Sequence, residues 1–149
     1  MELKPDKLPR ECTYALDTVT LIYFLEHHPR FYQDAKNLFQ RVETGEITAL
    51  ISSLVFAELL VPAYRWNENR RAENILRILS NFPNLSIVPL TVKISSAAAQ
   101  LRAMHGLRTP DAIHAATALE EGARGFITND KVFLKIATDD FGIWLFADR

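Results

Sequence analysis

Four acidic residues, far apart in the sequence, lie at or near the ends of stretches predicted to be helices or strands: Asp17, Glu58, Asp111 and Asp130. Carboxylate oxygens are the ligands that Mg²⁺ and similar hard cations take in proteins. Carboxylates that lie close together raise one another's pKa, and a bound divalent cation relieves that conflict. The reaction that such a site supports is metal-assisted phosphodiester hydrolysis, in which the ion activates water and stabilises the leaving oxygen.

The stretch from 108 to 130, RTPDAIHAATALEEGARGFITND, predicts a helix, a glycine stop and a short strand. Thr109 suits a helix cap and Pro110 suits the first helical position, which puts Asp111 in the first turn. The apolar, β-prone run GFIT then leads to Asp130 just past its end. One helix–strand unit therefore presents two carboxylates at the ends of its elements.

These residues also have purely structural interpretations. Asp111 in a first turn could only complement the helix dipole, and Asp130 could only be a cap or turn residue. The pair His27-His28 could suggest a metal site, but Pro29 follows it at a helix end, which favours a solvated loop.

Glu58 is the only charge in the run LVFAELLV at residues 54–61, which follows the helix-capping pair Ser52-Ser53. A helix that is apolar on every side is expected to be buried. An ionised carboxylate in such a helix is costly unless something pairs with it, so Glu58 is a candidate functional residue. An arginine partner in the core, or a position at the edge of the fold, is the structural alternative.

Short apolar runs alternate with helical patterns along the whole chain. This order predicts an α/β fold, a three-layer α/β/α sandwich around a five-stranded, mostly parallel sheet. The expected strands are 13–16, 47–51, 85–88, 125–128 and 143–146. In such sheets the working site lies beyond the carboxyl ends of the strands, where the four acids are expected to converge.

Length and composition set the remaining bounds. The chain has 149 residues, a net charge of −1 and one cysteine, Cys12, which predicts one domain without a disulfide framework or a cysteine-based zinc site. Residues 1–12 are expected to form a flexible arm and 13–149 a single domain. Neither a signal peptide nor a membrane span is expected, so a cytoplasmic location is the default. The arginine-rich helix predicted at 66–80 is the best candidate for a basic or partner-binding surface.

From residue 14 to 146 the sequence resembles the PIN-domain ribonucleases, in particular the VapC-type toxins of toxin–antitoxin pairs. Four segments carry the resemblance: LDTVTLIYFLE, SSLVFAELL, TPDAIHAATALEEGA and GFITND. It implies a Mg²⁺- or Mn²⁺-dependent endoribonuclease acting on RNA, usually a homodimer, silenced by a cognate antitoxin protein. It places Asp17, Glu58, Asp111 and Asp130 on the acidic quartet of the family, and Thr128 on a supporting hydroxyl.

The resemblance also suggests roles. Asp17 and Asp111 would bind the principal metal, Asp130 would complete the site or hold a second ion, and Glu58 would bind through water or orient the attacking water. The family often has a small polar residue two positions after the first acid, where this chain has Val19. Such a departure would weaken the surroundings of Asp17 and lower activity unless neighbouring threonines compensate. The family tolerates histidine at the position of His114, where a core or helix-face role is expected rather than catalysis.

Three other classes of protein share parts of this pattern. A haloacid dehalogenase-type aspartyl phosphatase would need a second Asp at the position of Val19. A phospho-receiver domain would need an acceptor Asp after the strand at 85–88, and the segment LSIVPL has none. A catalytically inactive PIN-like module that only binds RNA or protein would leave the four carboxylates without a purpose.

Overall fold

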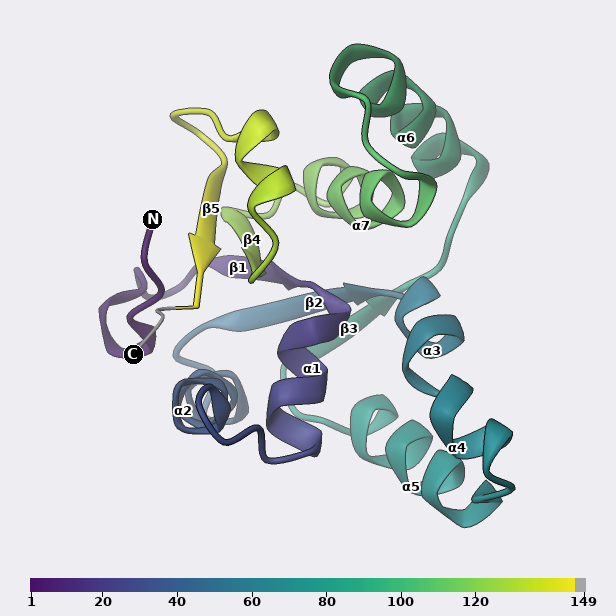
Figure 1. Cartoon of the computed structure of the whole chain (residues 1–149). Helices are drawn as coiled ribbons and strands as arrows, with labels where there is room; N and C mark the ends of the chain where they lie inside the picture. Colours follow the sequence, from purple (N-terminus) through teal and green to yellow (C-terminus); the bar gives the residue numbers. More distant parts are fainter. Residues whose placement is uncertain (147–149) are drawn as a thin grey trace.

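A computed structural model describes residues 1–146 and contains a sheet in the strand order β3-β2-β1-β4-β5. Every neighbouring pair in this sheet is parallel (Figure 1). The strands are β1 (Thr13–Leu16), β2 (Thr48–Ser52), β3 (Leu85–Val88), β4 (Gly125–Thr128) and β5 (Gly142–Leu145). The predicted five-stranded parallel sheet is therefore confirmed, with β2 and β5 displaced by one residue.

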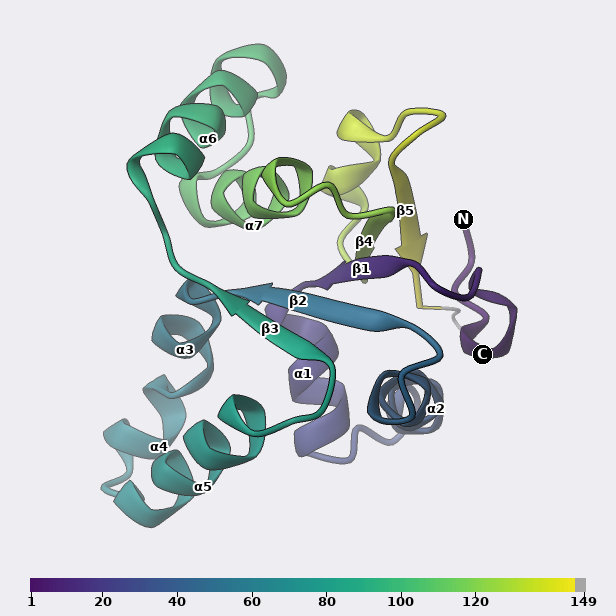
Figure 2. The same cartoon turned by 180° about the vertical axis from the view of Figure 1, so that it is seen from behind.

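Helices cover both faces of the sheet, as Figures 1 and 2 show from opposite sides. Helices α6 and α7 lie on one face, and α1, α2 and α5 lie on the other. The helices are α1 (Thr18–Leu25), α2 (Tyr32–Glu43), α3 (Leu54–Leu59), α4 (Val61–Arg65), α5 (Asn69–Ser80), α6 (Val92–His105) and α7 (Thr109–Glu120). Two 3₁₀ helices, η1 (Pro5–Lys7) and η2 (Lys131–Ile136), complete the elements, so the three-layer prediction is confirmed.

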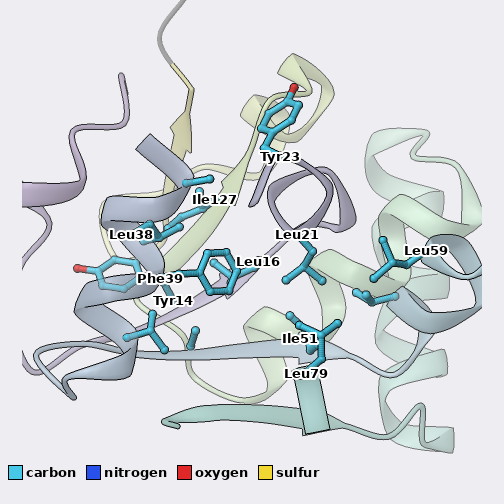
Figure 3. Packing of buried hydrophobic residues seen from close by; sticks show 14 of the residues in the cluster. Tyr14, Leu16, Leu21, Tyr23, Leu38, Phe39, Ile51, Leu59, Leu79 and Ile127 are labelled. Atoms are coloured by element: carbon cyan, nitrogen blue, oxygen red, sulfur yellow. The ribbon is translucent and has the colours of Figure 1, made fainter. Parts of the chain in front are cut away.

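The short apolar strands are buried because both of their faces are covered, as in other parallel sheets. All four residues of β4 are buried, whereas β3, at one end of the strand order, has only Val88 buried. Leu16, Phe39 and Ile127 belong to the core on the α1 and α2 side (Figure 3). Burial on this scale fixes the ends of β1 and β4, from which two of the acidic residues extend.

Residues 1–12 do not form the loose arm expected from their polar composition. Leu3 and Leu8 are buried, and backbone hydrogen bonds link Leu3 and Met1 to Leu145. The guanidinium of Arg41 donates to the carbonyl oxygens of Pro5 and Leu8, at 2.6 and 2.8 Å. The segment therefore packs against the end of the sheet, because its two leucines gain burial and its carbonyls gain a buried cation.

The helix expected to be buried over 54–61 is also different in the structure. It ends at Leu59, and α4 begins at Val61 with a proline in its first turn. Ala57 and Glu58 are exposed, since α3 and α4 lie beside the sheet rather than beneath another layer. The edge position is the correct alternative, and burial of Glu58 in an apolar helix is wrong. Within residues 1–146, no helix is long and apolar enough to cross a membrane.

Candidate active site

The four acidic residues line a single pocket beyond the carboxyl ends of β1 and β4. Its volume is about 740 Å³. It is lined by Asp17, Thr18, Val19, Ile22, Tyr23, Glu58, Arg108, Asp111, Asn129, Asp130 and Lys131. The carboxyl ends of parallel strands and the amino ends of the helices that follow them meet at the same rim, which is why residues so distant in sequence come together.

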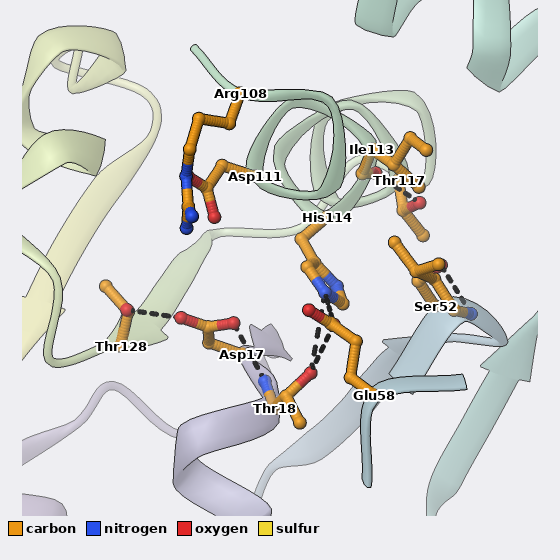
Figure 4. A network of polar contacts seen from close by, with 11 residues as sticks. Asp17, Thr18, Ser52, Glu58, Arg108, Asp111, Ile113, His114, Thr117 and Thr128 are labelled. Carbon is orange, nitrogen blue, oxygen red and sulfur yellow. Dashed lines mark hydrogen bonds and ion pairs between the residues drawn. The ribbon is translucent and has the colours of Figure 1, made fainter. Parts of the chain in front are cut away.

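Asp17 joins β1 to α1 and is the most tightly held of the four carboxylates. Its Oδ1 accepts from the backbone N–H of Thr18 at 2.8 Å, and its Oδ2 accepts from the hydroxyl of Thr128 at 2.7 Å (Figure 4). Burial raises the pKa of Asp17, and the hydrogen bond from Thr128 and the nearby His114 oppose that rise. Thr128 also accepts from the backbone N–H of Asp130 at 3.1 Å, so one buried hydroxyl connects two of the acids.

Glu58 reaches the pocket from α3 with its side chain 36 % exposed. Its Oε1 accepts from the hydroxyl of Thr18 at 2.8 Å and lies 2.5 Å from Nε2 of His114, a residue of α7 (Figure 4). The hydrogen bond from His114 is the main cause that lowers the pKa of Glu58, and partial burial opposes it. His114 is buried, as expected for a core role, but it also contacts an acid of the site, which was not expected.

Asp111 lies buried in the first turn of α7 and faces a cation. Its Oδ2 accepts from Nε of Arg108 at 3.1 Å, and the Arg108 side chain is 77 % exposed. This contact is the largest cause that raises the pKa of the Arg108 guanidinium. Arg108 and Lys131 line the same pocket as the acids. Two exposed cationic side chains therefore border the carboxylates without being buried with them.

Asp130 has both of the roles weighed for it. Its Oδ1 accepts from the backbone N–H of Val132 at 2.9 Å and caps η2, while the residue also lines the pocket. Asn129 beside it donates to the hydroxyl of Tyr23 at 2.9 Å. The lining of the pocket also includes two apolar residues of α1, Val19 and Ile22.

The threonines next to Val19 do not contribute equally. Thr18 reaches the carboxylate of Glu58, as described above. Thr20 is fully buried and donates to the backbone oxygen of Ile127 at 3.1 Å, which ties α1 to β4. Thr18 alone therefore adds a hydroxyl contact to the acidic cluster from this part of the chain, and it contacts Glu58 rather than Asp17 through that hydroxyl.

The donor chemistry of the pocket fits a hard divalent cation, because its acids supply oxygen ligands only and one of them, Asp17, is raised in pKa by burial. In the described part of the chain, however, no three such side chains are gathered at the spacing of a metal cluster. Asp111 is turned toward Arg108 and Glu58 toward His114. The predicted convergence on one pocket is observed, whereas the predicted ligand roles stay predictions.

Arg108 and His114, the side chains that contact Asp111 and Glu58, could be found in the sequence only through their spacing from Asp111. His114 follows Asp111 by three residues, and Arg108 precedes it by three, so both spacings place side chains on neighbouring positions of a helix surface. The contact between His114 and Glu58 joins α7 to α3 across 56 residues, and no local spacing indicates it. This geometry defines a class of protein: an α/β/α domain with a carboxylate-lined pocket beyond its strand ends.

Comparison with known families makes the class specific. The sequence matches the family described as PIN domain over residues 14–139. Because that match spans most of the chain, the protein belongs to the PIN domain family, and the resemblance inferred from the four acidic segments is confirmed. A comparison with curated protein sequences gave no match.

Solved structures share the fold. VapBC2 from Rickettsia felis, bound to a DNA fragment from its promoter, has a TM-score of 0.65 and 23 % identity, over 88 % of this chain and 96 % of that one. Mycobacterium tuberculosis VapC20, a Sarcin-Ricin loop cleaving toxin, has a TM-score of 0.68 and 16 % identity, over 85 % and 97 %. VapBC-1 from nontypeable Haemophilus influenzae has a TM-score of 0.64 and 22 % identity, over 90 % and 97 %. The TM-scores show that this chain shares its fold with the three structures. Because the identities are below 25 %, the likeness shows the fold alone.

Proposed function

We propose that this protein is a metal-dependent endoribonuclease that hydrolyses RNA phosphodiester bonds with Mg²⁺ or Mn²⁺. The observation that carries the proposal is that Asp17, Glu58, Asp111 and Asp130 of a PIN domain line one pocket. A divalent cation held there would supply Lewis-acid activation of water and charge stabilisation at the leaving oxygen. Membership of the PIN family and the oxygen-only donor set both support this reaction class.

The roles of the residues follow from their contacts. Asp17 is fixed by Thr128 and by the backbone of Thr18, so its carboxylate is presented without reorganisation and is assigned to the principal ion. Asp111 would hold the same ion, and the mostly exposed side chain of Arg108 would then turn from it toward the solvent. Asp130 would complete the ligand set or hold a second ion, and Thr128 contacts both Asp17 and Asp130.

Glu58 is assigned the role expected from the sequence: it would either bind the ion through a water molecule or orient the attacking water. Its carboxylate is more exposed than Asp17 and its pKa is lowered by His114, so it stays ionised beside the reacting group. Arg108 and Lys131 border the acids and would bind the phosphates that flank the scissile bond. The apolar residues Val19 and Ile22 offer a surface for the neighbouring ribose or base.

We further propose that the protein is the toxin of a toxin–antitoxin pair. The support is the shared fold with VapBC2 of Rickettsia felis, with VapBC-1 of Haemophilus influenzae and with a toxin–antitoxin complex from Klebsiella pneumoniae. A cognate antitoxin protein, an RNA substrate, a homodimeric state and a cytoplasmic location belong to this proposal. Co-expression with the protein encoded next to it should relieve the growth arrest that expression of this chain alone would cause.

The direct test is incubation of the purified protein with total RNA, with Mn²⁺ and with Mn²⁺ plus a chelator. Cut fragments should form only with the free metal ion, and mapping of their ends should show discrete sites. Asp111→Asn should lose this cleavage, since the amide cannot replace the anionic ligand. Metal-independent cleavage, or full activity of Asp111→Asn, would contradict the assignment.

A binding module without catalysis is the alternative, and one observation favours it: the carboxylate of Asp111 is paired with Arg108. A Mn²⁺ titration followed by thermal unfolding separates the two functions. A nuclease site should raise the unfolding temperature as Mn²⁺ increases, because an ion that binds only the folded state stabilises it. A module that only binds RNA or protein should show no such rise.

A further inference from the structure

Among the buried side-chain nitrogen and oxygen atoms of residues 1–146, one has no hydrogen-bond partner: Nδ1 of His114. The residue is 2 % exposed, and the other buried residues of α7 include Ala112, Ala115 and Ala118. A buried polar atom without a partner lowers the stability of a fold, so an apolar side chain would suit this position better. The presence of histidine here requires a reason other than packing.

The other ring nitrogen supplies that reason. Nε2 of His114 lies 2.5 Å from Oε1 of Glu58, and a carboxylate oxygen only accepts, so Nε2 carries the proton of this hydrogen bond. The hydroxyl of Thr18 donates to the same oxygen at 2.8 Å. Both contacts fall on Oε1, and among residues 1–146 no hydrogen bond to Oε2 is recorded.

Glu58 needs such a restraint because of its position. It lies on a helix of six residues beside the sheet, and its side chain is 36 % exposed. A long carboxylate side chain in that position would otherwise sample many rotamers in water. The contacts with His114 and Thr18 instead hold it at the pocket that Asp17 lines.

We infer that His114 is a positioning residue: its Nε2–H holds the carboxylate of Glu58 in place at the metal-binding rim, at the expense of an unpaired Nδ1. The inference rests on the proposed role of Glu58 in the nuclease site. His114 contacts neither ion nor substrate in this account and acts through Glu58.

The test compares His114→Leu with His114→Gln in the full chain, by calorimetric titration with Mn²⁺ and by unfolding without metal. Mutation of a residue that hydrogen-bonds to a metal ligand typically lowers metal affinity by about 10–100-fold. His114→Leu should therefore weaken Mn²⁺ binding within that range. Its stability without metal should be unchanged or higher, because the unpaired nitrogen is gone. His114→Gln keeps an N–H donor near the place of Nε2 and should restore most of the affinity.

A double-mutant cycle with Glu58→Gln identifies the path of the effect. If His114 acts through Glu58, His114→Leu should cause little further loss of affinity in the Glu58→Gln background. Thr117→Val is the matched control, since Thr117 is buried on the same helix and donates to Ile113 within it. It should leave Mn²⁺ affinity unchanged.

Several results would overturn the inference. These are wild-type Mn²⁺ affinity in His114→Leu, equal losses with and without Glu58, or a His114→Gln protein that behaves like His114→Leu. Because Mn²⁺ binding is measured without RNA, a wild type that binds Mn²⁺ but cuts no RNA would refute the nuclease and leave the positioning role tested. A wild type that binds no Mn²⁺ would refute both.

Discussion

Two regions of this molecule bury charged side chains, and they treat them differently. At one end of the sheet, the buried guanidinium of Arg41 donates to Glu46 at 2.8 Å and to the backbone oxygens of Pro5 and Leu8. At the rim of the pocket, Asp17 is raised in pKa, Asp111 pairs with an exposed arginine, and His114 leaves one nitrogen unpaired. The first region gives one cation three acceptors, whereas the second gathers four carboxylates, each with one or two donors, around one pocket.

The difference separates a structural use of buried charge from a functional one. Buried charges stabilise a fold only when their hydrogen bonds are satisfied, which is the situation of Arg41. The pocket instead brings four carboxylates together, and like charges at close range disfavour one another's ionised form even where each carboxylate has a hydrogen-bond donor. The two regions should therefore respond in opposite ways to substitution.

The largest effect is expected for Asp17→Asn. The amide keeps the shape but removes the buried anion, so cleavage of RNA should fall by at least about 100-fold, as when a preorganised electrostatic group is lost. Without metal, the variant should be as stable as the wild type or more stable, since burial disfavours the ionised carboxylate. Single-turnover cleavage and thermal unfolding measure the two effects. A marked fall in the free energy of unfolding without metal would mean that Asp17, like Arg41, is a charge that stabilises the fold.

The pH dependence of the same pair of proteins checks the cause. Burial raises the pKa of Asp17 in the folded state above the ordinary value of an aspartate, so the folded state binds the proton more tightly. That contribution to stability is fully present below the unfolded pKa and is lost as the pH rises through the folded pKa. The metal-free wild type should therefore lose stability relative to Asp17→Asn across this window. Parallel profiles of the two proteins in urea unfolding would contradict the raised pKa.

Arg41→Met tests the other region. It leaves two backbone oxygens and Glu46 without their donor, so the free energy of unfolding should fall by about 2–4 kcal/mol. Mn²⁺ affinity of the folded protein should not change, because Arg41 does not line the acidic pocket. Urea unfolding and Mn²⁺ calorimetry are the measurements. A change in metal affinity as large as that of Asp17→Asn would remove the distinction between the regions.

A smaller effect is expected for Thr128→Val. The substitution removes the hydroxyl that donates to Asp17 and accepts from the backbone of Asp130. Mn²⁺ affinity should fall by about tenfold, near the lower end of the loss typical when a hydrogen-bond partner of a metal ligand is removed. Since the hydrogen bond from Thr128 lowers the pKa of Asp17, that pKa should rise further in the variant. Calorimetry at several pH values would detect both changes, and unchanged affinity would limit Thr128 to packing.

The smallest effect is expected for Arg108→Gln. Arg108 is an exposed partner of Asp111, and exposed ion pairs contribute little, so the free energy of unfolding should hardly change. Removing this competitor should raise Mn²⁺ affinity a few-fold while weakening RNA binding at low salt, and both changes should shrink at high salt. Arg70→Gln, exposed on α5 and outside the pocket, is the control. Equal effects of the two variants would reduce Arg108 to general surface charge.

The sequence predicts the sheet well because short apolar runs between turn residues have few alternatives. The strands β1, β3 and β4 begin and end where their composition indicates. It fails for α3, since apolar composition shows which residues prefer burial but not whether another element covers them; here Ala57 and Glu58 face outward. It fails likewise for residues 1–12, where two leucines among charged residues are enough to dock the segment.

For the site, placement is predictable and contacts are not. Strand ends and helix starts of a parallel sheet share one edge, which brings Asp17 and Asp130 together with Asp111 from sequence alone. Whether a carboxylate faces its neighbouring acids or a cation depends on side-chain rotamers and on partners from other elements. The hydrogen bond between His114 and Glu58 is such a contact, and it required coordinates.

The hydroxyl of Thr128 meets the carboxylate of Asp17 across 111 residues of sequence. A chain that is still emerging from the ribosome has Asp17, Glu58 and Asp111 well before β4 is made, and until then β1 lacks one of its two neighbours. The pocket can therefore form only after β4 and the lining residues Asn129, Asp130 and Lys131 have left the ribosome. Under the proposed nuclease function, fragments cut off before residue 128 should cleave no RNA.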